Sequence, residues 1–190
     1  MRIEPLAPRH LKAFEGLFRA SGSPCFCRYW HFTGDKNAWL ERCAMDEDES
    51  LREQTAAVVR GTDEARGLLA FDEDLAVGWM KLTPRASVPK LRGLPVYRAL
   101  DLGPDDGVYA IGCFLVHPEH RKRGVAHALL AAADAHVRAW GGRAIEAYPR
   151  RTTEPMYPEQ VMQGPLAAFL AGGYTQIAGE GQYPVLRKAL

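Results

Sequence analysis

The stretch from residue 108 to residue 140 constrains the fold most strongly, because three kinds of sequence follow one another there. The apolar run Val-Tyr-Ala-Ile-Gly-Cys-Phe-Leu-Val predicts a buried strand. A short polar turn comes next, and an alanine-rich segment follows it. Apolar residues recur in that segment every three or four positions, at Val125, Leu129, Ala133, Val137 and Trp140. This spacing predicts an amphipathic helix, so the stretch as a whole predicts a strand, a turn and a helix.

The turn between this strand and helix has the composition of a phosphate site. The first turn of a helix has backbone N–H groups without partners and carries about half a positive charge. Gly124 lacks a Cβ and Ala126 has only a methyl group, so an anion could approach those amides closely. Arg121, Lys122 and Arg123 add positive charge. These features predict a diphosphate at the helix N-terminus, and the alternative is a merely solvated basic connection.

Two familiar phosphate motifs do not match this turn. The P-loop needs a glycine, four residues and then Gly-Lys-Ser/Thr, whereas the dinucleotide fingerprint needs three spaced glycines after a strand. The pattern that is present, Arg121-x-x-Gly124-x-Ala126, resembles motif A of the GNAT superfamily of acyl-CoA-dependent N-acetyltransferases. Its setting supports the resemblance, since Cys-Phe-Leu-Val-His-Pro precedes it and Ala-Leu-Leu follows it.

The resemblance implies that acetyl-CoA is the co-substrate and that no metal takes part. The pantetheine arm would pair with the strand backbone like an added strand, and a backbone N–H near Leu115 would polarise the thioester carbonyl. The diphosphate would lie on the amides of residues 123–126. The residues expected to bind the cofactor are Phe114, Leu115, Val116, Arg121, Lys122, Arg123, Gly124, Val125, Ala126 and His127.

The remaining elements follow the order of the GNAT fold. Sequence patterns predict a strand at 2–6, helices at 8–20 and 35–60, a hairpin at 65–82, a strand at 143–148, a helix after 165 and a hairpin at 174–190. We therefore expect one α/β (α+β) domain over residues 1–190, with a helical N-terminal region at about 8–60 and a motif A core at about 108–140. Its central sheet would be mixed, mostly antiparallel, split at the acyl-CoA site and flanked by helices on both faces.

Two long segments, 83–107 and 150–164, show no clear period. Long connections of this kind tend to be functional covers or disordered segments. We expect the first of them to form a flap on the active-site or CoA side.

Direct transfer to an amine needs a base, because a free amine is mostly protonated at pH 7. Glu146 and Tyr148, on the strand beside the expected split, are the catalytic candidates. Further candidates are Asp105, Asp106 and Tyr109, near the start of the motif strand. The sequence does not choose among them, and each could equally be a surface carboxylate or a packed ring.

One position departs from the superfamily pattern. Many members place a tyrosine four residues before the glycine that ends the last helix, where it protonates the leaving thiolate. This chain has Phe169 there, and the ending is Gly173-Tyr174. Tyr148 or Tyr157 is then the alternative acid, or solvent protonates the thiolate, which a thiol pKa near 8.5 permits.

The chain has cysteines at 25, 27, 43 and 113, in no spacing typical of a disulfide framework. Cys25 and Cys27, with His31 and Cys43, could supply metal ligands, but Cys-x-Cys differs from the usual Cys-x-x-Cys of zinc sites. We expect reduced, packed thiols, with Cys113 packing mid-strand rather than acting as a nucleophile. Cys-x-Cys-x-x-Trp also resembles an uncharacterised bacterial subgroup of the superfamily, and the role of its two cysteines stays open.

Composition limits the classes of partner that this chain is expected to bind. The formal charge of +1 favours neither nucleic acid nor an anionic membrane. No run reaches the roughly 18 apolar residues of a membrane helix, and the N-terminus lacks the apolar region of a signal peptide, so a cytoplasmic location is expected. The expected partner is a small-molecule or peptide amine, and a homodimer is a further option. Two alternatives are a non-catalytic CoA-binding sensor module and a phosphate- or nucleic-acid-binding protein that uses the basic turn.

Overall fold

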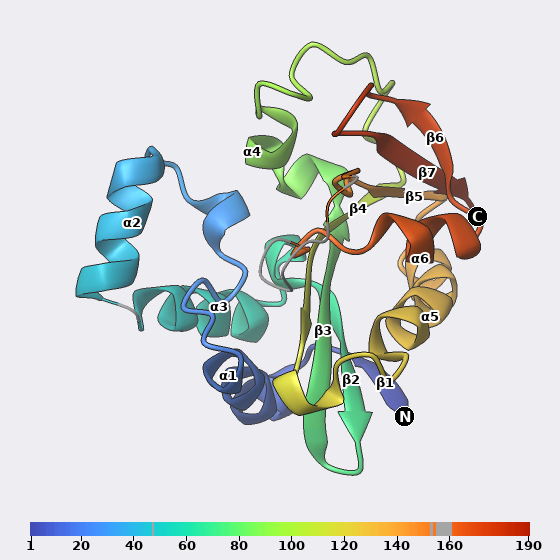
Figure 1. The fold of residues 1–190 in the computed structure, drawn as a ribbon. Helices are drawn as coiled ribbons and strands as arrows, with labels where there is room; N and C mark the ends of the chain where they lie inside the picture. The colour runs from blue at the N-terminus through green and yellow to red at the C-terminus, as the bar shows by residue number, and fades with distance from the viewer. Residues whose placement is uncertain (47, 153, 155–160) are drawn as a thin grey trace.

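A computed structural model describes residues 1–46, 48–152, 154 and 161–190. Its described strands form one seven-stranded sheet in the order β1-β2-β3-β4-β5-β7-β6 (Figure 1). The strands are β1 (Arg2–Pro5), β2 (Gly67–Asp72), β3 (Leu75–Pro84), β4 (Val108–Val116), β5 (Ala144–Ala147), β6 (Thr175–Ala178) and β7 (Val185–Ala189). Among these pairings β4 and β5 run parallel and the others antiparallel. The predicted mixed, mostly antiparallel sheet is confirmed.

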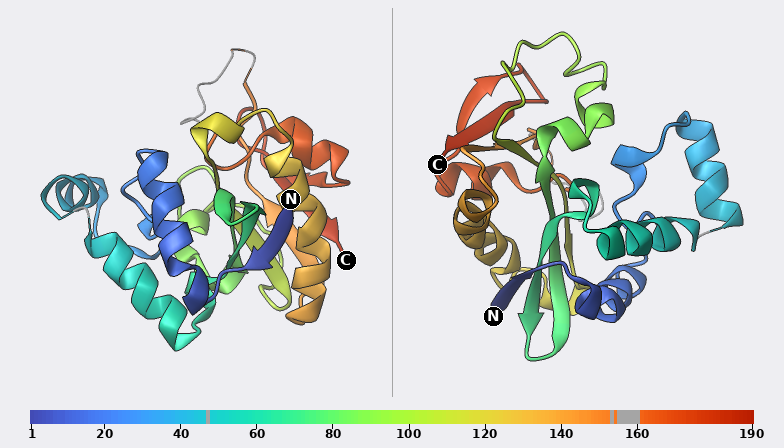
Figure 2. Two further views of the ribbon diagram at one scale, coloured as in Figure 1. Left: turned by 90° about the horizontal axis from the view of Figure 1, so that it is seen from below. Right: turned by 180° about the vertical axis from the view of Figure 1, so that it is seen from behind.

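Helices cover both faces of this sheet (Figures 1 and 2). On one face lie α1 (Leu11–Ala20), α2 (Lys36–Met45), α3 (Glu49–Arg60) and the short α4 (Pro89–Arg92), and on the other lie α5 (Val125–Ala139) and α6 (Leu166–Ala171). Single 3-10 turns occur at Pro8–His10, Tyr29–His31, Asp63–Ala65, Arg85–Ser87 and Pro118–His120. Within the described residues, none of the helices combines the length and apolarity needed to cross a bilayer.

Each face of the sheet has its own apolar core. The face under α5 and α6 packs Leu68 and Met80 of the sheet against Val125 and Leu129. The opposite face packs Trp79 into an aromatic group whose other members, Phe14, Phe18 and Phe26, come from α1 and the segment after it. A sheet buried on both faces needs apolar residues at successive strand positions, which explains the long apolar runs in β2, β3 and β4.

The segment from 83 to 107, which we expected to form a flap on the active-site or CoA side, has secondary structure of its own. It carries α4 and buries Val88, Leu91 and Tyr97 against Trp30 and Tyr148 in a third apolar cluster. The apolar residues that do this lie at irregular intervals, so no helical or strand period revealed them. The segment is therefore a packed layer over the end of the sheet where β4 meets β5.

The predicted split of the sheet lies between β4 and β5. The two strands pair from Val108 with Ala144 to Ile111 with Ala147, where β5 ends and β4 continues to Val116. On its other edge β4 pairs with β3, and the register passes from Leu82↔Ile111 to Lys81↔Cys113. Gly112 is thus an extra residue, a β-bulge that bends β4 where it leaves β5.

Gly78 lets α5 approach β3 closely, because a Cβ at this glycine would lie 2.4 Å from Val125 Cγ1. We expect Gly78→Ala to lower the free energy of unfolding by about 1–3 kcal/mol, through overpacking. Gly16→Ala is the matched control, since its Cβ would meet nothing within 4 Å on α1. That control should raise the free energy by about 0.5–1 kcal/mol. Urea unfolding measures the free energy of unfolding of both variants. Equal changes in the two variants would contradict the close packing of Gly78 against α5.

Candidate functional site

The turn before α5 forms a cavity of about 220 Å³. Two residues of the turn adopt left-handed backbone conformations, Lys122 with φ 59° and Gly124 with φ 80°. Seven of the ten residues predicted to bind the cofactor line this cavity, namely Val116, Arg121, Lys122, Gly124, Val125, Ala126 and His127. Arg123 is exposed in the same turn but does not line it. The cavity brings small residues, cationic side chains and the positive end of the α5 dipole together, the combination that binds anions.

Two residues that sequence reasoning missed, His120 and Pro165, also line this cavity. His120 belongs to the 3-10 turn after β4, and its Nε2 lies 3.7 Å from Asp72 Oδ2. Pro165 immediately precedes α6. His120 directly precedes Arg121 in the same turn, whereas Pro165 reaches the cavity only because α6 packs beside α5.

The hydrogen-bond register decides which β4 amides face the split. His117 N–H donates to Val77 O at 2.9 Å, and residues alternate along an antiparallel ladder. Leu115, opposite Trp79, therefore directs its own N–H toward β3, whereas Phe114 and Val116 direct theirs toward the split. The N–H predicted near Leu115 is thus that of a neighbouring residue. Phe114 N–H donates to Met162 O at 2.6 Å, so the segment before α6 lies against the split.

The Cys-x-Cys-x-x-Trp stretch supports the bulge in β4. Phe26 and Cys27 both have positive φ, 40° and 57°, and Trp30 Nε1 donates to Gly112 O at 3.0 Å. Trp79 Nε1 lies 2.9 Å from Cys27 Sγ. Left-handed conformations are costly for residues with a Cβ and persist where packing over-determines them. The stretch thereby fixes Trp30 over the bend of β4.

The cysteines are free thiols. Burial raises the pKa of the Cys27 thiol, which keeps it protonated and unreactive. Within residues 1–46, 48–152, 154 and 161–190, no cluster of His, Cys, Asp or Glu is arranged to hold a metal ion.

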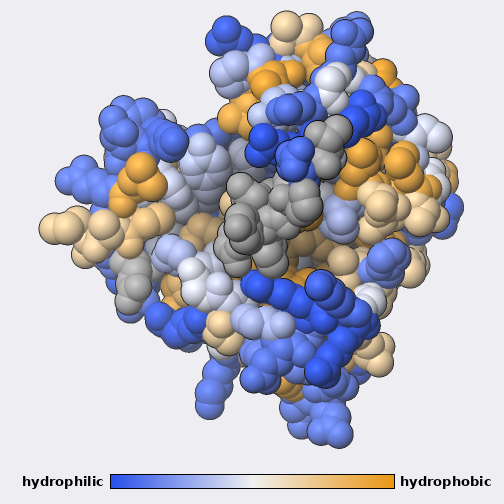
Figure 3. Space-filling model, viewed as in Figure 1, coloured by the Kyte–Doolittle hydropathy of each residue, from blue (hydrophilic) through white to orange (hydrophobic). Residues whose placement is uncertain are grey.

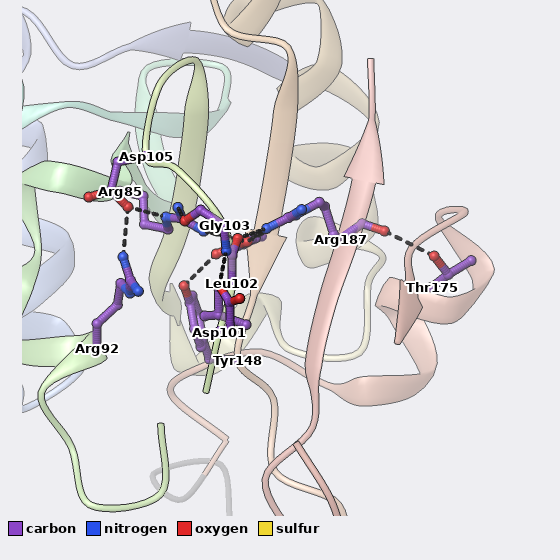
Figure 4. Close-up of polar contacts among 10 residues, drawn as sticks. Arg85, Arg92, Asp101, Leu102, Gly103, Asp105, Tyr148, Thr175 and Arg187 are labelled. Carbon is purple, nitrogen blue, oxygen red and sulfur yellow. Dashed lines mark hydrogen bonds and ion pairs between the residues drawn. The ribbon is translucent and has the colours of Figure 1, made fainter. Parts of the chain in front are cut away.

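The two catalytic candidates, Glu146 and Tyr148, lie in a buried ionic network. Figure 4 shows Tyr148, Arg85 and Arg187 of this network. Glu146 is fully buried, and its Oε1 accepts from Arg85 Nη1 at 2.9 Å and from Arg187 Nε at 3.0 Å. Tyr148, also fully buried, donates its hydroxyl to Glu146 Oε2 at 2.6 Å. Burial and then the neighbouring carboxylate raise the pKa of Tyr148, so its hydroxyl stays protonated. These contacts show the candidates bonded to each other and to two arginines.

The other candidates are also engaged. Asp105 bridges Arg85 and Arg92, at 2.5 and 2.8 Å, and Asp106 lies 3.5 Å from Arg143. The Tyr109 hydroxyl accepts from Arg66 Nη1 at 2.9 Å. Tyr157, named as an alternative acid, lies outside the described residues. Phe169 packs between Phe114 and Tyr174 in the core, so this position offers no proton donor.

Lys81 is a buried cation that sequence reasoning missed, although a lysine inside the apolar run of β3 was the available signal. It is fully buried opposite Cys113, and its Nζ donates to Glu64 O at 2.7 Å. Burial lowers the pKa of Lys81 from 10.5 to about 8.

Comparison with known proteins agrees with this geometry. The model of the acetyltransferase (GNAT) family matches residues 26–160. A solved PaiA N-acetyltransferase from Thermoplasma acidophilum, in complex with coenzyme A, is 14% identical over 100% of both chains, with a TM-score of 0.56. An aminoglycoside 6'-acetyltransferase type Ii is 13% identical over 100% of this chain and 97% of that one, with a TM-score of 0.57. At these identities the structures show a shared fold. A comparison with curated proteins gave no match.

The buried Lys81 gives a testable dependence of stability on pH. Between pH 8 and 10.5 the folded protein loses the proton of Lys81 while the unfolded chain keeps it, so stability from this group rises with pH. We expect the stability of the wild type, relative to Lys81→Met, to increase by up to about 1.4 kcal/mol per pH unit in that window. Urea unfolding at several pH values measures the difference. Lys12→Met, at an exposed position, should give a flat difference, and a flat line for Lys81→Met would contradict the buried ammonium.

Proposed function

The chain belongs to the GNAT family of acetyltransferases, and we propose that it transfers an acetyl group from acetyl-CoA directly to a primary amine of a small molecule or peptide. The observation that carries the proposal is the alignment of two features along β4. The cationic cavity at the N-terminus of α5 lies at one end of the free edge of β4, and the bulge at Gly112 lies at the other. An extended acyl-CoA arm between them would reach the point where the sheet splits.

The residues of this chain suit the co-substrate in two places. At the cavity, a Cβ on Gly124 would meet nothing within 4 Å, so the space over that glycine is open. Arg121 and Lys122 would balance the charge of the diphosphate there. Along β4, the split-facing N–H groups of Phe114 and Val116 would pair with the extended arm. Similar solved proteins include several that are described as complexes with coenzyme A or acetyl-CoA.

Phe114 N–H is our candidate for stabilising the negative charge that develops on the thioester oxygen during attack by the amine. This N–H already donates to a carbonyl oxygen, that of Met162, which shows that an oxygen atom fits at this donor. The segment 161–164 would have to move aside for the thioester to take this place.

The attacking amine must give up a proton before or during the transfer. Glu146 and Tyr148 stay the catalytic candidates, because they are the titratable pair at the end of β5 beside the split. Their contacts favour a supporting role, since the carboxylate balances Arg85 and Arg187 and has no exposed surface. In that case the amine would pass its proton to water and not to Glu146.

A second candidate function is a CoA sensor without catalysis. The observation in its favour is Phe169, which stands where many family members carry the tyrosine that protonates the thiolate. Sensor and enzyme both bind acetyl-CoA, but only the enzyme releases a thiol when an amine is added.

Calorimetric titration with acetyl-CoA and with CoA, followed by a thiol-release assay over a panel of amines, tests the proposal. Binding together with amine-dependent release is the expected result. Binding without release would favour the sensor, and absence of binding would contradict both functions.

The phosphate cavity is tested by Gly124→Glu, which places a carboxylate where the diphosphate is expected. We expect affinity for CoA to fall at least about tenfold, because an attraction becomes a repulsion. Gly124→Ala is the matched control, since it shares the strain of a Cβ at φ 80° without adding charge. The control should keep most of the affinity, and retained affinity in Gly124→Glu would remove this cavity from the proposal.

The Glu146→Gln variant distinguishes a structural role of the Glu146 carboxylate from a catalytic one. If the carboxylate mainly balances the buried Arg85, we expect the free energy of unfolding to fall by about 3–5 kcal/mol, because a buried charge loses its partner. The folded fraction should keep the pH profile of turnover. Urea unfolding and pH-dependent kinetics are the measurements. Full stability with turnover lost at neutral pH and recovered at high pH would instead identify Glu146 as the base.

A further inference from the structure

A second cavity, of about 430 Å³, lies on the face of the sheet opposite α5. Residues 30–34 form one wall, Ser87 and the start of α4 form another, and Glu64 also lines it. The space-filling view shows the surface hollowed between the lobe that carries α2 and the lobe that carries α4 (Figure 3). Neither the basic turn nor the phosphate cavity includes any of these residues.

This second cavity adjoins the place where the sheet splits. Trp30 lines it, and Trp30 Nε1 donates to Gly112 O, in the bulge of β4, at 3.0 Å. One side chain thus extends from the cavity wall to the strand that borders the split. A molecule in the cavity could therefore reach the split from the face opposite the phosphate cavity.

The positive charge on the wall of the second cavity has no acidic partner. Lys90 Nζ donates to Phe32 O at 2.9 Å and to Gly34 O at 3.0 Å, and it lies over the rings of Tyr29 and Phe32. It forms no ion pair with a carboxylate in the part of the chain that the structure describes. Burial lowers the pKa of Lys90 more than Asp35 raises it. The ammonium group of Lys90 is therefore without a counter-charge.

The negative charge on the wall, that of Glu64, is already neutralised. Its Oε2 accepts from Arg28 Nη2 at 3.3 Å, and its Oε1 lies 3.9 Å from Arg60 Nη2. The fully buried Lys81 donates to the backbone oxygen of the same residue at 2.7 Å. Arg28 is also shared with Glu53. These three cations outnumber the two carboxylates, so this wall has an excess of positive charge.

His31 gives an independent indication of a missing ligand. Its side chain lines the cavity and is only 5% exposed, yet its Nε2 has no hydrogen-bond partner within the described part of the chain. Burial, followed by the positive charges of Lys81 and Arg28, lowers the pKa of His31 to about 2, so the ring is neutral. The neighbouring charges thus create a positive potential at this ring. An anionic oxygen in the cavity would favour a proton on Nε2, which could then donate to it.

Hydroxyl groups complete the set of donors on the walls. Thr33 and Ser87 line the cavity, and among the described residues neither hydroxyl has a hydrogen-bond partner. An ammonium group, two hydroxyls and an imidazole nitrogen together suit the oxygen atoms of a carboxylate. The rings of Trp30 and Phe32 offer apolar surface beside them for a carbon chain.

We propose that the second cavity binds a carboxylate of the acceptor, so that the substrate class is amines that also carry a carboxylate. The proposal rests on the proposed function and adds the class of acceptor to it. The carboxylate would lie in the second cavity, and the carbon chain would pass along Trp30 toward the split, where the amine receives the acetyl group.

Three probes with a terminal amine on a five-carbon chain test the sign of the charge that the cavity prefers. They are aminopentanoate, pentylamine and diaminopentane, whose other ends are a carboxylate, a methyl group and an ammonium group. Each is titrated calorimetrically into the full chain with saturating CoA, which cannot react, and in parallel without CoA. We expect aminopentanoate to bind at least about tenfold more tightly than pentylamine, because it adds charge-assisted hydrogen bonds. Diaminopentane should bind no more tightly than pentylamine.

Two variants test the residues that carry the proposal. Lys90→Met removes the ammonium group and keeps a long, unbranched side chain, so the preference for aminopentanoate should fall several-fold. Lys12→Met is the matched control, since Lys12 is exposed on α1 and its loss removes the same charge. His31→Phe, which keeps a ring and removes the unpartnered nitrogen, should also weaken binding of aminopentanoate several-fold. Thermal unfolding of each variant verifies that it is folded.

Equal affinity for aminopentanoate and pentylamine, tighter binding of diaminopentane, or an undiminished preference in folded Lys90→Met would overturn the proposal. Failure of the proposed function gives a different result, namely absence of CoA binding or of thiol release with every amine. The titrations without CoA judge the second cavity independently of that result.

Discussion

The rest of the site depends on β4 leaving its neighbour β5 while staying bonded to β3. Beyond Ile111 the strand has a free edge, and its split-facing N–H groups need partners because an unpaired buried amide is costly. The bulge at Gly112 produces this bend, and Trp30 holds the bulge by bonding its carbonyl oxygen. The site is therefore an interruption of the sheet, where Phe114 N–H bonds Met162 O at an edge that an extended ligand could pair with.

The buried charges at the end of β5 are the second constraint on the site. The end of β5 buries Glu146 between Arg85 and Arg187, and such a group is stable only while every ion keeps its partners. The network joins the segment after β3, the end of β5 and strand β7. It holds together three segments that border the split and leaves little freedom for the carboxylate to act as a mobile base.

The sequence predicted those features that depend on neighbouring residues. The helix at 125–139, its glycine start and its basic turn can be predicted because periodicity and charge are local, and the order of elements along the chain agreed with the resemblance. The packing of the 83–107 segment was not predicted, because its buried residues are irregularly spaced and pack against Trp30 and Tyr148 from distant parts of the chain. The arginine partners of Glu146 and the carbonyl that Lys81 bonds were equally out of reach, since they come from residues between 17 and 61 positions away.

By itself the sequence determined the basic turn, the strand and helix around it, and the identity of the residues that carry charge there. Only the tertiary structure decided which β4 amides face the split, which carboxylates are already paired and where a second cavity opens. The physical reason is that backbone direction and burial depend on register and on layers packed from distant segments. The order of residues along the chain specifies neither register nor packing. The chemical type of a side chain is therefore known from the sequence, but whether that side chain is buried or already bonded is not.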